Sequence, residues 1–463
     1  MFLKDELHSK EDHSLRRSGD LQNSISQCIF DHFRCPTSFL KFSTDEGSLS
    51  EPGYFHFGSD TTCYGRSTHN SNQVSRAASH DLFDEVGIER GSVCLPFNPT
   101  EVIDNLRLER YVGQRSGPEL FKRLYYWLRP LSTFWLRKQI KQLHFRNWRD
   151  LNFPRWPVDT TVESLCENLL LLSLQAKNTD RVPFVWLWPN GARGCVTMTH
   201  DVDTDSGMDF CTELMDMDDS FGVKSAFQIV PEERYHASPS ALQEMRNRGF
   251  EIGIQDLNHD GRLFDDKQEF LRRIAIVNQY GKLYGARGFR AAVLYRKPSW
   301  YEHLDFSFDM SIPNVAHLDP QRGGCCTITP YFIGNVLELP VTTTQDYTLF
   351  HLLREHSIDL WETQIELILK KNGLVSFIVH PDYIIEMEAR RLYEALLQKL
   401  AKLRTDDSVW FALPCEIDNW WRNRSRMRVE RHGQSWKIVG LGAENARLAY
   451  AKNVNGRLVY ELG

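Results

Sequence analysis

Hydrophobic and polar positions follow two different patterns between residues 194 and 414. Short runs rich in apolar residues, which predict buried strands, cover 195–199, 225–230, 250–254 and 374–379. Between them, apolar residues recur at helical spacing over 242–248, 267–284, 360–371 and 389–403. Strands that alternate with amphipathic helices are typical of a parallel sheet or barrel, so this part of the chain predicts an α/β fold.

The patterns outside this segment predict several smaller regions. The first residues are polar, charged and aperiodic, as in a mobile tail, and the short apolar pieces after them favour strands. The last stretch alternates apolar and polar residues, and Val454-Asn455-Gly456 offers a hairpin turn within it. The predicted division is a mobile tail (1–25), a small accessory module with strands (26–100), a helical connecting region (101–190), the α/β domain (191–415) and a small β appendage (425–463).

Residues 119–149 form a basic, aromatic segment with a helical pattern that Pro130 interrupts. Eight lysines and arginines stand there against the single acidic residue Glu119. Such a pair of helices can lie on an anionic membrane surface. It can equally be a connecting hairpin whose aromatic side chains pack on the neighbouring domain. The sequence leaves both interpretations open, and peripheral membrane contact is the one with functional consequences.

Composition limits the function classes. Of the 463 residues, 41% are hydrophobic and 25% charged, as is ordinary for a folded protein, and the net charge of -6 gives no general reason to expect a nucleic-acid partner. The N-terminal stretch lacks the apolar core of a signal peptide, and no run of roughly 18 apolar residues follows. We therefore expect a cytoplasmic protein, placed at the inner membrane surface if the basic segment binds lipid. Ten cysteines without a CxxC pair do not suggest a disulfide framework.

Three polar clusters directly follow predicted strands. They are Thr199-His200-Asp201-Val202-Asp203, the stretch from Gln255 to His259, and His380-Pro381-Asp382-Tyr383. Because chemistry in parallel α/β folds sits at the carboxyl ends of the strands, we expect these clusters to meet on one face. Gln255 and His259 are four residues apart, a spacing that places two side chains on one face of a helical turn.

Five motifs in order resemble those of the polysaccharide deacetylase (NodB-homology) family. They are THDVD at 199–203, EIGIQDLNHDG at 251–261, GFRAAVLYRKPSW at 288–300, LELP at 337–340 and FIVHPDY at 377–383. The resemblance covers about 190–415 and implies a distorted (β/α) barrel. It also implies a metal-dependent hydrolase that removes an N- or O-acyl group from a sugar or a lipid-linked sugar precursor in polysaccharide biosynthesis.

The resemblance also implies roles for individual side chains. Asp201 would be the catalytic base and Arg290 the cation that holds it, while His380 would protonate the leaving group. Asp382 and Tyr383, close to that histidine in sequence, would contact substrate. Each assignment has a structural alternative: the aspartates at 201 and 203 could cap the next helix, Arg290 could form an ordinary salt bridge, and His380 could be a buried turn residue.

A divalent, zinc-like ion is the cofactor that the resemblance implies, with Asp203, His259 and the side chain at position 255 as ligands. Gln255 stands where the family has a second histidine, and its amide oxygen is a poorer zinc ligand than imidazole. His200, Asp256 or a water could supply the missing donor. The sequence therefore leaves open whether the chain is a working hydrolase with a weak ligand or an inactive barrel that binds carbohydrate or acts as a scaffold.

Overall fold

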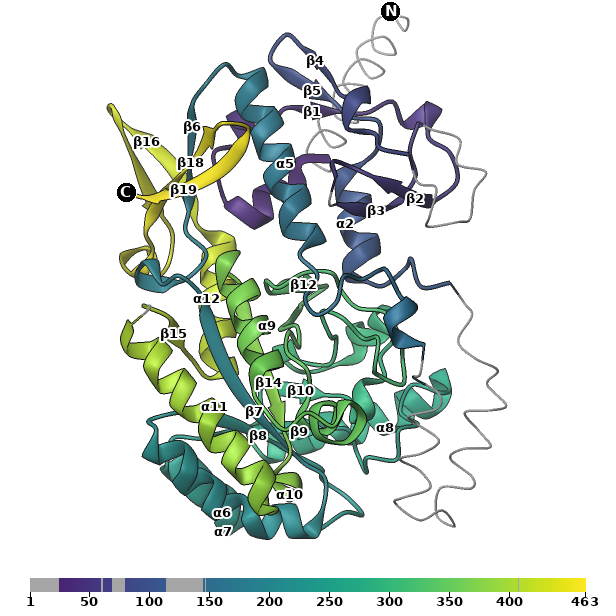
Figure 1. Cartoon of the computed structure of the whole chain (residues 1–463), viewed down its shortest axis with the longest axis vertical. Coiled ribbons are helices and arrows are strands. Elements are labelled where there is room, and N and C mark those ends of the chain that lie inside the picture. Colours follow the sequence, from purple (N-terminus) through teal and green to yellow (C-terminus); the bar gives the residue numbers. More distant parts are fainter. Residues whose placement is uncertain (1–24, 60, 69–79, 114–144, 146, 407) are drawn as a thin grey trace, which may run out of the picture. The chain divides into compact units, whose positions relative to one another are not determined.

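The computed structural model describes residues 25–59, 61–68, 80–113, 145, 147–406 and 408–463 (Figure 1). These fall into two compact units, one made of 1–111, 161–191 and 422–463 and the other of 112–160 and 192–421. The predicted tail and most of the basic segment 119–149 lie outside the described residues. Within the described part of the chain, no helix is long and apolar enough to cross a membrane.

The larger unit is built on a curled, mostly parallel sheet, which confirms the predicted α/β class and the distorted barrel. Its strands pair in the order β12-β13-β11-β10-β9-β8-β7-β14, and β15 pairs with β7. Their bounds are β7 Cys195–Val202, β8 Ser225–Ile229, β9 Glu251–Gln255, β10 Gly288–Arg290, β11 Phe308–Asp309, β12 Tyr331–Ile333, β13 Val336–Glu338, β14 Leu374–Val379 and β15 Trp410–Phe411. Only β12 and β13 pair antiparallel among these described strands.

Helices between the strands cover the outside of this sheet, and α9 and α11 run alongside β7 and β14 (Figure 1). The helices are α6 Asp205–Ser220, α7 Pro239–Asn247, α8 Lys267–Leu283, α9 Asp359–Lys370, α10 Pro381–Ile384, α11 Met387–Asp406 and α12 Pro414–Arg426. Local sequence explains where several begin, because Thr204, Ser238 and Asp266 each accept a backbone hydrogen bond at a helix start. Four of the helices match the predicted ranges within a few residues, whereas α6 was not anticipated.

The two faces of β7 differ in chemistry, and the difference positions the site. Val196, Met198 and Val202 belong to the apolar core between the sheet and its helices. Thr199 and Asp201, at alternate positions, are buried on the opposite face. Because side chains alternate along a strand, the inside of the curled sheet is lined by polar groups that converge toward the carboxyl ends of the strands.

The smaller unit joins segments that the sequence predicted as separate regions. Its elements are β1 Phe42–Ser43, β2 Gly53–His56, β3 Thr62–Gly65, β4 Gly87–Glu89, β5 Ser92–Cys94, α2 Pro99–Arg107, α5 Thr161–Ala176, β6 Arg181–Val185, β16 Arg428–His432, β17 Ser435–Val439, β18 Leu448–Val454 and β19 Arg457–Leu462. β6, predicted within a helical connecting region, pairs with β18 of the C-terminal segment. This pairing ties the C-terminal strands to the segment 161–191, and both belong to one compact unit with the N-terminal residues.

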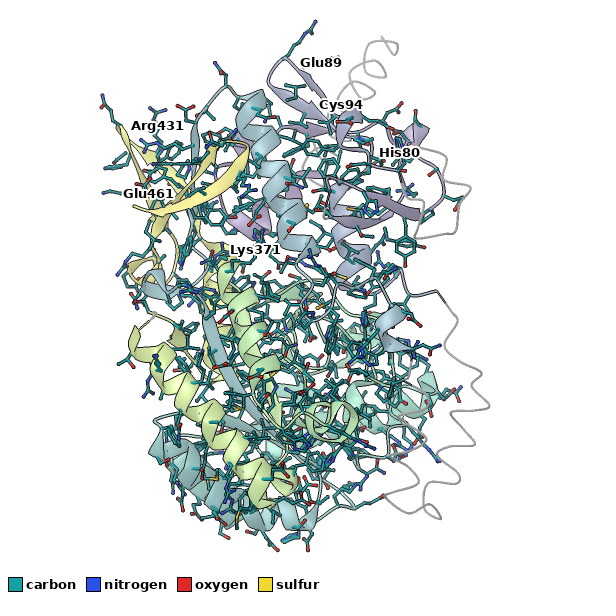
Figure 2. The ribbon with its side chains drawn as sticks, in the orientation of Figure 1. His80, Glu89, Cys94, Lys371, Arg431 and Glu461 are labelled. Atoms are coloured by element: carbon teal, nitrogen blue, oxygen red, sulfur yellow. The ribbon has the colours of Figure 1, made fainter. Side chains whose placement is uncertain are left out.

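The hairpin turn predicted near the C-terminal end is present. β18 and β19 form a hairpin in which Val454 pairs with Arg457, and Asn455 and Gly456 have φ of 53° and 78°, as the predicted turn requires. All ten cysteines lie within the described residues and are unpaired there. Cys94 on β5 is the exposed one (Figure 2).

Candidate active site

The carboxyl ends of four strands bring the sequence-predicted residues together. Asp201 is near the end of β7, Gln255 and Arg290 are the last residues of β9 and β10, and His380 directly follows β14. Arg290 and Gln255 are register partners across the β9–β10 pair. The strands β10, β9, β8, β7 and β14 are consecutive neighbours in the sheet, so these side chains share one rim.

Asp201 is held at both carboxylate oxygens. Its Oδ1 accepts a hydrogen bond from Arg290 Nη1 at 3.1 Å, and its Oδ2 accepts one from Gln255 Nε2 at 3.3 Å. Arg290 is fully buried and also donates to Thr199 Oγ1 at 3.0 Å. The guanidinium, anchored by Thr199, therefore orients the carboxylate through one hydrogen bond, and Gln255 supplies the other.

Two opposing effects act on the pKa of Asp201. Burial raises the pKa of this carboxyl above its ordinary value, whereas the charges of Arg290 and His380 act in the opposite direction, and burial prevails. A carboxylate with a raised pKa is a stronger base than an exposed one. The arrangement suits proton abstraction better than a purely structural ion pair would.

Asp203 lies between two histidines. One of its oxygens is 3.2 Å from His259 Nε2, and the other is 3.9 Å from His380 Nε2. Neither Asp201 nor Asp203 caps α6, because the cap is Thr204, whose side chain accepts from Gly207 N. The capping alternative for the two aspartates is therefore excluded.

His380 is oriented by Asp346, a residue that the sequence analysis missed. Asp346 accepts from His380 Nδ1 at 2.7 Å and from its backbone N at 2.6 Å. Burial of His380 lowers the pKa of the imidazole, but Asp346, Asp203 and Asp201 together outweigh burial and raise the pKa to about 10. The ring is thus held as a cation whose Nε2 points to the side of Asp203.

Asp346 was missed because no pattern marks it in the sequence. It ends the polar run 342–346, whose side chains attach to β14 from the side: Thr342 Oγ1 donates to Leu374 O at 2.8 Å, and Thr343 Oγ1 donates to Ser376 O at 2.8 Å. These contacts carry the run along β14 to His380. Asp346, and not the neighbouring Asp382, is therefore the carboxylate that binds Nδ1 of His380.

Asp382 and Tyr383, the predicted substrate contacts, lie beside His380. The rings of Tyr383 and His380 have centroids 4.9 Å apart. Burial raises the pKa of Asp382 to about 6, although the charge of His380 opposes it. Both side chains are placed to line the rim, and contact with substrate stays a prediction.

The stretch between Gln255 and His259 is not the helical turn that their spacing suggested. Gln255 is the last residue of β9, and both Asp256 and His259 adopt a φ of 54°, in the left-handed region. Arg234 fixes the bend by donating from Nη2 to His259 O at 2.7 Å. A strand end followed by a tight bend, and not a helix face, brings the two side chains to the rim.

Two candidates for the missing donor point elsewhere. His200 is fully buried on the apolar face of β7, where its ring nitrogens are 3.0 Å from Asp218 Oδ2 and 3.2 Å from Val379 O. Asp256 is buried, and its Oδ1 accepts from Leu257 N at 2.6 Å. Strand alternation explains His200, because adjacent residues of β7 face opposite sides.

The side chains at the rim can hold a divalent ion only if ligands of different chemical types are combined. No group of three His, Cys, Asp or Glu residues in the described chain is arranged to hold a metal ion. Gln255 supplies a third donor of a different kind: its Nε2 donates to Asp201, so its buried Oε1 faces away and has no hydrogen-bond partner among the described residues. An acceptor left in this state is suited to a cation, and the binding of one by Asp203, His259 and Gln255 stays a prediction.

Comparisons with known proteins give structural similarity only. No protein-family model and no curated protein matches the sequence. A Mycobacterium smegmatis protein assigned as a polysaccharide deacetylase is 18% identical, with a TM-score of 0.42, over 51% of this chain and 93% of that chain. Puue allantoinase is 12% identical (TM-score 0.41, 51% of this chain, 92% of that chain). A family 4 acetyl xylan esterase from Clostridium thermocellum, solved with a cobalt ion, is 17% identical (TM-score 0.31, 49% and 91%).

Proposed function

We propose that this chain is a hydrolase that removes an acyl group from the nitrogen or oxygen of a sugar. The observation that carries the proposal is the pairing at one rim of a buried carboxylate held by Arg290 with an imidazolium held by Asp346. Acyl hydrolysis needs a base to activate water and an acid to protonate the leaving group. Asp201 and His380 supply the two roles from neighbouring strands.

The chain's own side chains divide the proton transfers. Asp201 takes a proton from the attacking water at its carboxylate, and Arg290 keeps that carboxylate oriented. His380 gives its Nε2 proton to the departing sugar nitrogen or oxygen. Asp346 holds Nδ1, so that the proton to be transferred is on the other nitrogen.

A divalent ion at this rim would be held by Asp203, His259 and Gln255. When bound, such an ion polarises the acyl carbonyl and stabilises the negative charge that develops on its oxygen. The neutral amide of Gln255 in place of an imidazole makes the site weaker than one with two histidines. The contact between Gln255 and Asp201 also couples the ligand position directly to the base.

That same contact favours a second candidate, a carbohydrate-binding protein without catalysis. Gln255 Nε2 occupies Asp201 Oδ2, one of the two oxygens through which the base would meet water. A binding protein would keep the polar rim for sugar hydroxyls and need no proton transfer. The two functions differ in a single measurable product, the released acid.

The test measures acetate released from acetylated amino sugars, acetylated xylo-oligosaccharides and a lipid-linked acetylamino sugar. We expect release by the wild type and its loss in Asp201→Asn, and circular dichroism checks that the variant folds, because the buried Arg290 loses its counter-charge. Asp209→Asn on the exposed side of α6 is the matched control and should retain activity. Binding of the sugars without acetate from any substrate would establish the second candidate instead.

A further inference from the structure

Two carboxyl groups without a role in the proposed mechanism are buried side by side in the larger unit. Asp309 ends β11 and Glu338, from the LELP motif, ends β13, and the two are register partners across this parallel pair. Both side chains are fully buried, as are their ionisable neighbours Tyr301 and Arg296. Because two adjacent buried carboxyl groups cannot both ionise without a large cost, the pair holds one proton.

The hydrogen bonds assign that proton to Glu338. Both oxygens of Asp309 accept from Ser311, Oδ1 from the hydroxyl at 2.7 Å and Oδ2 from the backbone N at 3.1 Å. Glu338 Oε1 accepts from Ile312 N at 2.9 Å, whereas no described residue donates to its Oε2. Burial and the charge of Asp309 raise the pKa of Glu338 well above its ordinary value. Glu338 is therefore a neutral acid that donates to Asp309.

Ser311 connects this acid pair to the cation that holds the catalytic base. Its hydroxyl, which donates to Asp309, accepts from Ala291 N at 2.8 Å. The carbonyl oxygen of Arg290 accepts from Asp256 N at 2.9 Å. Both polar groups of the peptide between Arg290 and Ala291 are thus fixed, one by the neighbouring strand and the other by a fully buried serine.

The backbone after Arg290 adopts a conformation that needs such anchors. Val293 and Leu294 have φ of 58° and 54°, in the left-handed region, which is rare for a β-branched side chain such as valine. Backbone strain of this kind persists only where the surrounding contacts hold the chain. Loss of the hydrogen bond to Ser311 would let this loop relax and would shift Arg290, three residues before Val293.

We propose that Glu338, as a neutral acid, and Asp309, as its carboxylate partner, are positioning residues for acyl hydrolysis. Through Ser311 they fix the peptide that follows Arg290 and thereby keep its guanidinium on Asp201. Neither carboxyl group touches substrate in this role. The catalytic consequence rests on the proposed function, whereas the anchoring of the backbone can be measured without catalysis.

The experiment compares three variants of the full-length protein with the wild type. Ser311→Ala removes the linking hydroxyl, and Asp309→Asn turns one acceptor into a donor that faces Ser311. Each should lower kcat for acetate release about tenfold or more and leave KM within about twofold, because the base is misplaced while the substrate still binds. Glu338→Gln should stay within about twofold of the wild type, because its amide can donate to Asp309 and accept from Ile312 N as the neutral acid does.

Hydrogen exchange and infrared spectroscopy test the anchoring and the proton without catalysis. Exchange over 288–296 should be faster in Ser311→Ala and Asp309→Asn, and unchanged in Glu338→Gln. At neutral pH the wild type should show the carbonyl band of a protonated carboxylic acid that Glu338→Gln lacks. Ser307→Ala, which removes a hydroxyl 3.5 Å from Arg287 at the other end of β11, is the matched control and should resemble the wild type.

The outcomes separate this inference from the proposed function. A folded Ser311→Ala with unchanged exchange and kcat would overturn it, and so would a folded but inactive Glu338→Gln or an infrared band that this variant retains. If Ser311→Ala does not fold, the two measurements on Glu338→Gln decide. If the wild type releases no acetate, the hydrolase is rejected, while exchange and the infrared band still show whether the acid pair anchors the segment after Arg290.

Discussion

Two buried histidines of the larger unit, each paired with an aspartate, have opposite surroundings. On the apolar face of β7, His200 contacts Asp218 with one ring nitrogen and Val379 O with the other. Asp218 is itself satisfied by Ser225 Oγ at 2.7 Å and Tyr393 Oη at 2.5 Å. At the rim, His380 gives only Nδ1 to Asp346, and its Nε2 is 3.9 Å from Asp203, too far for a hydrogen bond.

The comparison shows that a buried histidine and aspartate define no function by themselves. At the first pair every polar atom of the ring is used within the packing between sheet and helices, so the pair stabilises the fold. At the second pair one ring nitrogen is anchored and the other is directed toward neighbouring polar groups. An imidazole of this second kind can exchange a proton with a substrate.

The largest expected effect is on catalysis at the rim. His380→Ala should lower kcat for acyl hydrolysis by about 10²- to 10⁴-fold, the usual range for loss of a general acid. The loss should be greater for amides than for esters, because an amine leaves only when protonated. Steady-state kinetics on matched N-acetyl and O-acetyl substrates gives the measurement. Equal losses on the two substrates would exclude His380 as the proton donor.

Replacing the other histidine should act on stability. His200→Ala removes two buried contacts and leaves a cavity beside Asp218, so we expect the free energy of unfolding to fall by about 3 kcal/mol. Denaturant unfolding measures the loss, and kcat per folded molecule should change little. Tyr393→Phe, which removes one hydroxyl from the same pair, should cost about 1 kcal/mol. A reduced kcat at unchanged stability would contradict the structural role of His200.

Strand alternation made part of this arrangement predictable. The apolar runs located β7, β8, β9 and β14, because buried strands need apolar residues whatever their partners are. The same alternation, applied residue by residue, would have separated His200 from Asp201, since neighbours on a strand face opposite sides. Treating 199–203 as one polar cluster concealed that distinction.

Other parts of the site depend on contacts that are distant in sequence. Asp346 reaches His380 because threonine hydroxyls attach the run after β13 to β14, and hydroxyl contacts of this kind leave no periodic pattern. The bend that carries His259 depends on Arg234, which comes from the loop after β8. In the smaller unit, the pairing of β6 with β18 joins residues far apart in the chain, so local patterns could not group those segments.

Glu251, a half-buried acid at the opposite end of β9, provides a test of how packing affects the pH dependence of stability. Burial raises the pKa of Glu251 to about 7 from 4.5, and its Oε2 accepts from Cys415 N at 3.0 Å. The folded chain then keeps the proton to higher pH than the unfolded chain, so stability is greatest below pH 4.5 and falls as the pH rises toward 7. The total decline should be at most about 3 kcal/mol.

Glu251→Gln should remove this decline, because the amide does not titrate and its oxygen can still accept from Cys415 N. Unfolding midpoints between pH 4.5 and 7 for both proteins provide the measurement. Glu394→Gln on the half-buried side of α11 is the control and should keep the slope of the wild type. A wild-type stability that rises over this pH range would show that other groups dominate.

The smallest expected change concerns the ligand position at the rim. Gln255→His should raise zinc affinity about tenfold or more, because imidazole is a better zinc donor than a neutral amide oxygen. The buried Oε1 of Gln255, which has no partner among the described residues, and the Asp203–His259 pair at 3.2 Å are the reasons to expect weak binding already in the wild type.

Equilibrium dialysis with Zn²⁺ alone measures this effect without reference to activity. The wild type should bind one ion weakly, His259→Ala should bind less, and Gln255→His should bind more. Gln243→His adds a histidine on exposed α7 and controls for adventitious binding. The substitution at 255 also removes the hydrogen bond from Gln255 to Asp201 Oδ2. Tighter zinc binding should therefore be accompanied by an Asp201 carboxylate that no longer has this contact. If neither the wild type nor Gln255→His binds zinc, the rim is not a metal site. The difference in role between the two histidines would then depend only on the contact of His380 with Asp346.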